Sequence, residues 1–251
     1  MFKVIDPNTH NMRILDEKGN IRVVEYMYNF NVDPQSAMSA YYAGKMNVRK
    51  RQVIATLSEG NGIIVNPGAM QWVAGNVKIS SNIRSLGNII RNATTAKLTQ
   101  EKIVRPLYTG SGIVALEPTY RYLILEDLKD WDGGMVLENN MFIACDANAK
   151  LGVTARNTIS SALLGNEGFF NTYLAGNGVV VLGSKFPRQE LICIELHADT
   201  LRIDGSLAIA WSKSLKFTVE EATSTLAGSA LSGEGLLNVY RGTGRVLMSP
   251  F

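Results

Sequence analysis

The chain has 251 residues, of which 46% are hydrophobic and 19% charged, a balance typical of a folded globular protein and not of a disordered one. Its 25 basic and 22 acidic residues give a formal net charge of +3, a weaker imbalance than a dedicated nucleic-acid-binding domain usually carries. Two cysteines exclude a disulfide-stapled scaffold and favour a reducing cytoplasm.

The first 50 residues predict a β-hairpin followed by a short helix. Residues 12–14 and 21–28 are β-rich runs separated by a Lys-Gly-Asn turn. Residues 33–44 predict a helix, because an aspartate stands at the N-cap, a proline at the first helical position and a glycine at the end. We expect residues 1–50 to form an N-terminal extension that precedes a β domain over residues 51–251.

A compact basic stretch follows the predicted helix, and its cations are Lys45, Arg49, Lys50 and Arg51. Such side chains can contact phosphates or anionic lipid headgroups. The same charges on an edge strand would block edge-to-edge pairing of sheets. We favour the edge-strand interpretation and keep anion or membrane contact as the alternative.

Four Gly-x-Gly triplets punctuate the chain, and each ends one β-rich run and opens another. The last three triplets are spaced 66 residues apart, as judged by Gly112, Gly178 and Gly244. A second marker, a two-residue turn between β-rich runs, starts at Gly68, at Asn139 and at Gly205. The glycines predicted to form turns of the repeat are Gly60, Gly62, Gly68, Gly110, Gly112, Gly176, Gly178, Gly205, Gly242 and Gly244.

These markers predict an all-β fold built from three internally repeated units, with boundaries at about 51–102, 103–168 and 169–251. We expect the units to lie in a pseudo-threefold arrangement. Residues 245–248 follow the fourth triplet and have no unit after them. We expect this strand to pair back onto the first unit, because an open sheet edge would invite aggregation.

The order of three short segments resembles the altered-inheritance-of-mitochondria family over roughly residues 53–251. The segments are Asn-Pro-Gly-Ala-Met at 66–70, Gly-Asn-Glu-Gly-Phe-Phe at 165–170 and Gly-Glu-Gly-Leu-Leu at 233–237. The resemblance implies β-sandwich or double-stranded β-helix-like units similar to the tryptophan RNA-binding attenuation protein, a TRAP-like fold. It carries over no catalytic residue, and fungal members of the family are linked to inner-membrane organisation. The chain departs from the pattern at 99–103, which lacks the Glu-Gly-hydrophobic signature.

Residue patterns for catalysis or metal binding are sparse. Cys193, Glu195 and His197 alternate along one face of a predicted strand and could reach a common ion, but the other face is apolar, so we favour an ordinary strand. Glu126 and Asp127 begin an acidic stretch that could supply an acid–base pair, although a solvated loop is the favoured interpretation. We therefore expect no metal, no cofactor and no catalytic residue.

The segment 83–91 places Ile83, Leu86 and Ile90 at helical spacing, with Arg84 and Arg91 alongside. An apolar stripe flanked by arginines can meet a membrane surface or a partner. We favour packing of this segment against its own core or a neighbouring subunit.

The sequence thus favours a non-enzymatic binding or scaffold protein of the cytoplasm that associates with itself as a homo-oligomer. A peripheral membrane protein is the first alternative, and a protein partner fits the same residues. RNA binding rests on analogy with the attenuation protein alone, and the weak net charge disfavours nucleic acid. An enzyme that uses Glu126, Asp127 or His197 is the least favoured hypothesis.

Overall fold

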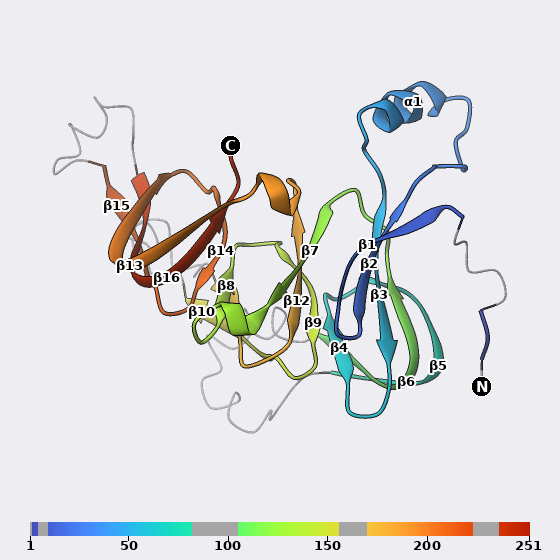
Figure 1. Ribbon diagram of the computed structural model, residues 1–251, viewed down its shortest axis with the longest axis horizontal. Coiled ribbons are helices and arrows are strands. Elements are labelled where there is room, and N and C mark those ends of the chain that lie inside the picture. Colours follow the sequence, from blue (N-terminus) through green and yellow to red (C-terminus); the bar gives the residue numbers. More distant parts are fainter. Residues whose placement is uncertain (1, 5–9, 82–104, 156–169, 223–235) are drawn as a thin grey trace, which may run out of the picture. The chain divides into compact units, whose positions relative to one another are not determined.

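The computed structural model describes residues 2–4, 10–81, 105–155, 170–222 and 236–251 (Figure 1). The described residues are mostly β-strand, which confirms the β fold predicted from the sequence. They form two compact units. The first comprises Met1–Glu126, Ile143–Asn148 and Val179–Pro187, and the second comprises Asp127–Phe142, Ala149–Gly178 and Arg188–Phe251. Among the described residues, no helix combines the length and the apolarity that crossing a membrane requires.

A nine-stranded sheet forms the first unit, in the order β1-β2-β3-β6-β4-β9-β12-β7, with β5 paired to β6. Its core is aliphatic, with Ile21, Val53, Ile63, Val114 and Val181 at most 1% exposed. The strands are β1 (Met12–Lys18), β2 (Ile21–Tyr26), β3 (Arg51–Leu57), β4 (Gly62–Val65), β5 (Met70–Ser81), β6 (Pro106–Leu116), β7 (Tyr122–Asp127), β9 (Phe142–Asp146) and β12 (Val179–Ser184).

A seven-stranded sheet forms the second unit, in the order β10-β11-β8-β14-β16-β13, with β15 paired to β16. Its core contains the stacked or tilted rings of Trp211, Phe217 and Tyr240, whose centroids lie 5.1–5.6 Å apart. The strands are β8 (Met135–Leu137), β10 (Lys150–Ala155), β11 (Phe170–Ala175), β13 (Ile192–Asp204), β14 (Ala208–Ser212), β15 (Lys216–Glu221) and β16 (Leu236–Met248). Two 3₁₀ turns, η2 (Leu128–Asp130) and η3 (Arg188–Glu190), also belong to this unit.

Two of the Gly-x-Gly triplets are turns, and two lie inside long strands. The triplets at 60–62 and 176–178 connect β3 to β4 and β11 to β12, as predicted. Those at 110–112 and 242–244 lie within β6 and β16, so the prediction of turns is wrong there. Gly110 has a φ of +113°, and a Cβ on it would lie 2.3 Å from the carbonyl oxygen of Asn76. The glycine thus lets the backbones of β5 and β6 approach closely.

The final strand does not pair with the first unit. Residues 245–248 belong to β16, where Val246 lies opposite Ile194 of β13 and Trp211 of β14. The prediction that this strand closes onto the first repeat is therefore wrong. The backbone groups of β16 are instead paired with β13, β14 and β15, which all precede it in the second unit.

The predicted N-terminal hairpin is present as β1 and β2, and β2 also pairs with β3. The predicted helix is present but begins later, since α1 spans Ala37–Lys45. The Asp33 carboxylate accepts the Ser36 N–H at 2.8 Å and the Ser36 hydroxyl at 2.9 Å, which closes a turn before the helix and lowers the pKa of Asp33. Gly44 lies inside α1, and Asn47, with a φ of +59°, follows its end.

An ion pair between β15 and β16 predicts a measurable pH response. The Arg241 guanidinium contacts both carboxylate oxygens of Glu220, with Nη2 2.6 Å from Oε2, and the Thr218 hydroxyl donates to Oε1. These hydrogen bonds lower the pKa of Glu220 to about 2. Because the folded pKa lies below the ordinary value of about 4.3, the pair stabilises the fold above that pH and the contribution is lost as the pH falls through about 2.

Both side chains are 36% exposed, so solvent screens the pair and its effect on stability is small. An NMR titration of the Glu220 side-chain carbonyl should give a midpoint near 2 in the wild-type protein, and a higher midpoint in Arg241→Ala, which loses the largest cause of the shift but keeps the Thr218 hydrogen bond. Arg202→Ala is the matched control, because Arg202 makes only the smallest contribution to the shift. A wild-type midpoint near 4 would contradict the pairing.

Candidate functional site

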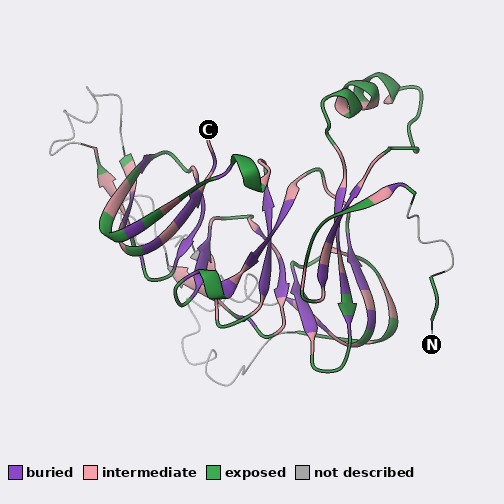
Figure 2. Cartoon of the chain, viewed as in Figure 1, coloured by how far each residue is buried: buried purple, intermediate pink, exposed green. Residues whose placement is uncertain are grey.

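Helix α1 stands clear of the sheet of the first unit. Figure 1 shows it at the end of two connections that leave β2 and return to β3, and Figure 2 shows its surface as almost wholly exposed. None of its nine residues is buried. Met38 is 73% exposed and Tyr42 is 62% exposed, while Met46, directly after the helix, is 77% exposed. Packing against the sheet therefore does not account for these apolar side chains.

The two connections add further apolar side chains to those of α1. Tyr28 and Phe30 stack on one another, with ring centroids 5.7 Å apart, although both are exposed. Exposed apolar side chains that gather in this way mark interaction sites on soluble proteins. We define the α1 surface as Tyr28, Phe30, Val32, Met38, Tyr41, Tyr42, Met46 and Val48.

A cavity of about 980 Å³ lies beneath α1, within the first unit. Three cations line it, namely Lys45, Arg49 and Lys50, and none of its lining residues is acidic. Five aromatic rings also line it: Tyr26, Tyr28, Phe30, Tyr41 and Tyr120. The cavity therefore presents aromatic walls and positive charge to whatever enters it.

Two of these cations lie over aromatic rings. Lys45 Nζ lies 5.4 Å from the ring centroid of Tyr41, and Lys50 Nζ lies 5.8 Å from that of Tyr120. Cation–π contacts of this length are weak at exposed sites. The two ammonium groups therefore remain able to turn towards an anion.

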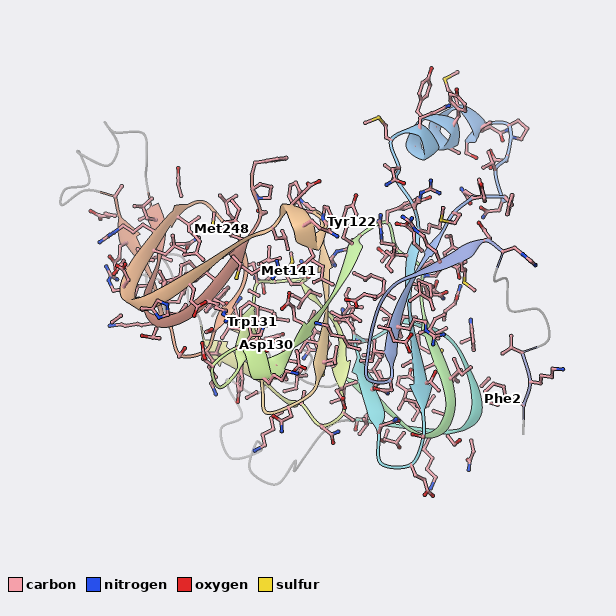
Figure 3. The ribbon with its side chains drawn as sticks, viewed as in Figure 1. Phe2, Tyr122, Asp130, Trp131, Met141 and Met248 are labelled. Carbon is pink, nitrogen blue, oxygen red and sulfur yellow. The ribbon has the colours of Figure 1, made fainter. Side chains whose placement is uncertain are left out.

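Below the cavity, Arg51 forms a buried ion pair with Glu25. Arg51 Nη2 lies 2.7 Å from Glu25 Oε2, and the two side chains are 3% and 2% exposed. The Arg51 guanidinium carbon also lies 3.9 Å from the ring centroid of Tyr122, which Figure 3 marks at the start of β7. Arg13 Nη2 contacts the other Glu25 oxygen at 2.8 Å. Because Arg51 is buried and paired, it supports the site and does not reach a ligand.

Arg49 ties the two connections of α1 together. Its guanidinium donates to the Met27 carbonyl oxygen and, at 2.6 Å, to Asn47 Oδ1. The Arg49 Nε also lies 4.0 Å from Glu25 Oε1. The Glu25 carboxylate thus connects the sheet to the base of α1.

The favoured edge-strand interpretation of the basic stretch is wrong. β3, which begins at Arg51, lies between β2 and β6 and not at an edge. Lys45, Arg49 and Lys50 precede β3 and line the cavity. They are therefore the predicted anion-contact residues that the structure brings together.

The other predicted candidates lie elsewhere. Arg84, Leu86 and Arg91 fall outside the described residues, so their role stays a prediction. Glu126, Asp127 and His197 do not line the α1 cavity. Within the described ranges, no three His, Cys, Asp or Glu side chains are grouped as metal ligands would be.

The acidic stretch after β7 has a local structural role. The Asp127 carboxylate accepts the Lys129 N–H at 3.1 Å and caps η2, which leads into the buried side chain of Trp131. Figure 3 marks Asp130 and Trp131 on this turn. His197 Nε2 lies 3.8 Å from Glu195, whose other oxygen lies 3.5 Å from Arg245 Nε.

Sequence reasoning missed the aromatic residues of the site. Five of the 17 residues from 26 to 42 are aromatic, which is far above the 8% of the whole chain. That density was the available signal, and Tyr26, Tyr28 and Phe30 alternate with smaller or polar residues in its first part. No sequence pattern predicted that Tyr41 and Tyr42 of α1 would both remain exposed.

Comparisons with known proteins identify the family. A family model described as mitochondrial biogenesis AIM24 matches residues 45–251. An uncharacterized protein of Streptococcus pyogenes serotype M6 is 25% identical over 197 residues, which cover 76% of this chain and 77% of that protein. A crystal structure of a Streptococcus pyogenes protein has a TM-score of 0.58 at 20% identity and covers 96% of this chain and 94% of that chain; it supports the fold alone. As its sequence resemblance predicted, this chain belongs to the mitochondrial biogenesis AIM24 family.

Proposed function

We propose that this protein is a non-enzymatic binding or scaffold protein, in which the two β units form the framework and the α1 surface is the docking site. The observation that carries the proposal is that α1 buries none of its residues, while its methionines and tyrosines are exposed. Exposed apolar side chains add nothing to the packing of the fold. They gain free energy only when a partner covers them.

We further infer that the framework consists of three copies of one TRAP-like strand unit in a pseudo-threefold arrangement. The pairings β5 with β6, β10 with β11, and β14 and β15 with β16 support this inference. In each case a strand that precedes a long link (β5, β10 or β15) pairs with the strand that follows the link (β6, β11 or β16). The strand after the link contains a Gly-x-Gly triplet in β6 and β16 and leads into one in β11. Tyr108, Tyr173 and Tyr240 precede their triplets in these strands.

The docking proposal predicts that polar substitutions on the α1 surface leave the stability of the fold intact. The double variant Tyr42→Ser/Met46→Ser should keep its free energy of unfolding within about 0.5 kcal/mol of wild type, since both side chains are exposed. Its retention on a phenyl-substituted column should fall. Urea unfolding and column retention of the full chain measure the two effects.

Ile79→Ser/Ile192→Ser is the matched control, because it removes two other exposed apolar side chains, 55% and 44% exposed, outside the α1 surface. This control should keep most of the column retention. A loss of more than about 1 kcal/mol in Tyr42→Ser/Met46→Ser would mean that these side chains serve folding. That result would overturn the docking proposal.

A further inference from the structure

We infer that the α1 surface binds an anionic lipid bilayer, with α1 in the interfacial layer and Lys45, Arg49 and Lys50 against the headgroup phosphates. The inference rests on the proposed function, because the same residues dock. It adds the chemistry of the partner. Three observations support it: the position of the apolar side chains of α1, the positive charges beside them, and the repulsion that these charges would produce against a second copy of the chain.

The large apolar side chains of α1 form one stripe, because Met38, Tyr41 and Tyr42 are spaced i, i+3 and i+4. Ala37, Ala40 and Tyr41 face the cavity, whereas Met38 and Tyr42 do not line it and are exposed. A helix that docks into a groove of another protein buries one stripe of side chains. A helix in the interfacial layer of a bilayer also buries one apolar face and keeps its polar face towards water, so the choice between a bilayer and a protein groove rests on the charges around α1.

The types of side chain also fit a bilayer interface. Tyrosine is enriched at the headgroup level because its ring is apolar and its hydroxyl is polar, and methionine and phenylalanine reach the acyl chains below. Three tyrosines lie on α1 or its connections: Tyr28, Tyr41 and Tyr42. Lys45 and Lys50 have long alkyl stems that let the ammonium groups reach phosphates while the stems stay in the apolar layer.

All charged side chains that line the cavity beneath α1 are positive. Lys45, Arg49 and Lys50 line it and no acidic residue does. Asp33 is the single carboxylate between residues 26 and 50, and it is held by Ser36 in the turn before α1. Clustered cations beside exposed apolar groups attract the negative surface of an anionic bilayer.

These charges argue against a second copy of the chain as the occupant. A twofold contact places the same patch on both partners, so three cations would face three identical cations with no carboxylate lining either cavity. A single-stranded nucleic acid would stack on rings and contact cations at the cavity. It would leave Met38, Tyr42 and Met46 exposed, so it accounts for less of the surface.

Most of this surface precedes the region matched by the family model, which begins at residue 45. Tyr28, Phe30, Met38 and Tyr42 therefore belong to a part of the chain that the family model does not describe. The apolar part of the inferred membrane contact therefore lies mostly before the matched region, whereas its cations Lys45, Arg49 and Lys50 lie within it.

The experiment is co-sedimentation of the full-length protein with vesicles of phosphatidylglycerol and phosphatidylcholine in equal parts, and with vesicles of phosphatidylcholine alone. Wild type should bind the anionic vesicles more tightly, and added salt should weaken the binding. Tyr42→Ser/Met46→Ser should lower the partition coefficient at least about tenfold by removing the buried apolar area. Lys45→Gln/Lys50→Gln should lower it at least about tenfold by removing two cations.

The matched controls replace exposed residues that do not belong to the α1 surface or line its cavity. Lys78→Gln/Lys216→Gln removes two exposed cations from β5 and β15, and Ile79→Ser removes an exposed isoleucine. Both controls should bind within about twofold of wild type, because neither removes an apolar residue of the α1 surface or a cation of the cavity. Thermal unfolding of every variant should match wild type, which excludes misfolding as the cause of lost binding.

Three results would overturn the inference. The first is equal vesicle binding by wild type and both α1 variants. The second is no vesicle binding by a wild-type protein that the phenyl column retains through Tyr42 and Met46, an outcome that leaves the docking function standing. The third is salt-sensitive retention on polyuridylate that Lys45→Gln/Lys50→Gln abolishes, without vesicle binding, because the site would then take single-stranded nucleic acid.

Discussion

Replacing Glu25 by alanine is expected to lower the free energy of unfolding by about 3–5 kcal/mol. The Glu25 carboxylate is 1% exposed and lies 2.7 Å from the guanidinium of Arg51, which is 3% exposed. Its removal leaves the Arg51 charge buried in the first sheet without a counter-charge. Arg13, which contacts Glu25 at 2.8 Å, would lose its partner as well. Urea unfolding followed by circular dichroism measures the change.

Glu17→Ala is the matched control, because Glu17 lies on the same hairpin and pairs with Arg22 at 3.0 Å while both side chains are more than 40% exposed. It should cost far less than Glu25→Ala, because solvent screens an exposed ion pair. The double variant Glu25→Leu/Arg51→Leu should recover much of the loss, because an apolar pair leaves no buried charge. Equal costs for Glu25→Ala and Glu17→Ala would refute the assignment of the buried pair.

The strand-rich fold could be predicted from sequence because glycine spacing and β-branched runs are local signals. The triplet at 110–112 was recognised as a break between β-rich runs, and β6 does change its backbone conformation there. Whether the chain turns or continues depends on its partner. Gly110 lies opposite Val77 in an unbroken ladder, and no local pattern specifies that pairing.

The helix boundary and the role of Arg51 show the same limit. Asp33 has the sequence features of an N-cap, but its hydrogen bonds with Ser36 close a turn before α1 begins. Arg51 belongs to a basic run whose pattern is typical of a solvent-exposed edge strand. Its burial depends on Glu25, directly opposite in the β2–β3 ladder, and a charge pattern along one strand does not reveal a partner on another.

The candidate site was predicted in part. The sequence offered Lys45, Arg49 and Lys50 as possible anion or membrane contacts, as the alternative to the favoured edge strand, and the structure places them around one cavity. The aromatic walls were missed, because aromatic residues in a soluble domain are usually buried. Tyr42 and Phe30 are exposed here because the connections carry α1 away from the sheet, a property of the tertiary structure.

Replacing Gly110 by alanine is expected to cost about 2–5 kcal/mol of stability. Gly110 has a φ of +113°, which an L side chain rarely adopts, and its Cβ would lie 2.3 Å from the carbonyl oxygen of Asn76. That oxygen belongs to the backbone of β5, so no side-chain rotation can relieve the overlap. The strands would have to separate where Gly110 of β6 lies opposite Val77 of β5.

Gly60→Ala isolates the effect of this close approach. Gly60 also has a positive φ, +86°, but a Cβ on it would meet nothing within 4 Å. It should therefore cost only the backbone strain, about 1 kcal/mol. Thermal and urea unfolding of the two variants measure the difference, and a Gly110→Ala protein no less stable than Gly60→Ala would contradict the close packing of β5 against β6. In the same triplet of β16 the counterpart of Gly110 is Gly242, where a Cβ would meet its nearest atom, Leu215 Cδ2, only at 3.7 Å, so Gly242→Ala should cost about as much as Gly60→Ala and less than Gly110→Ala.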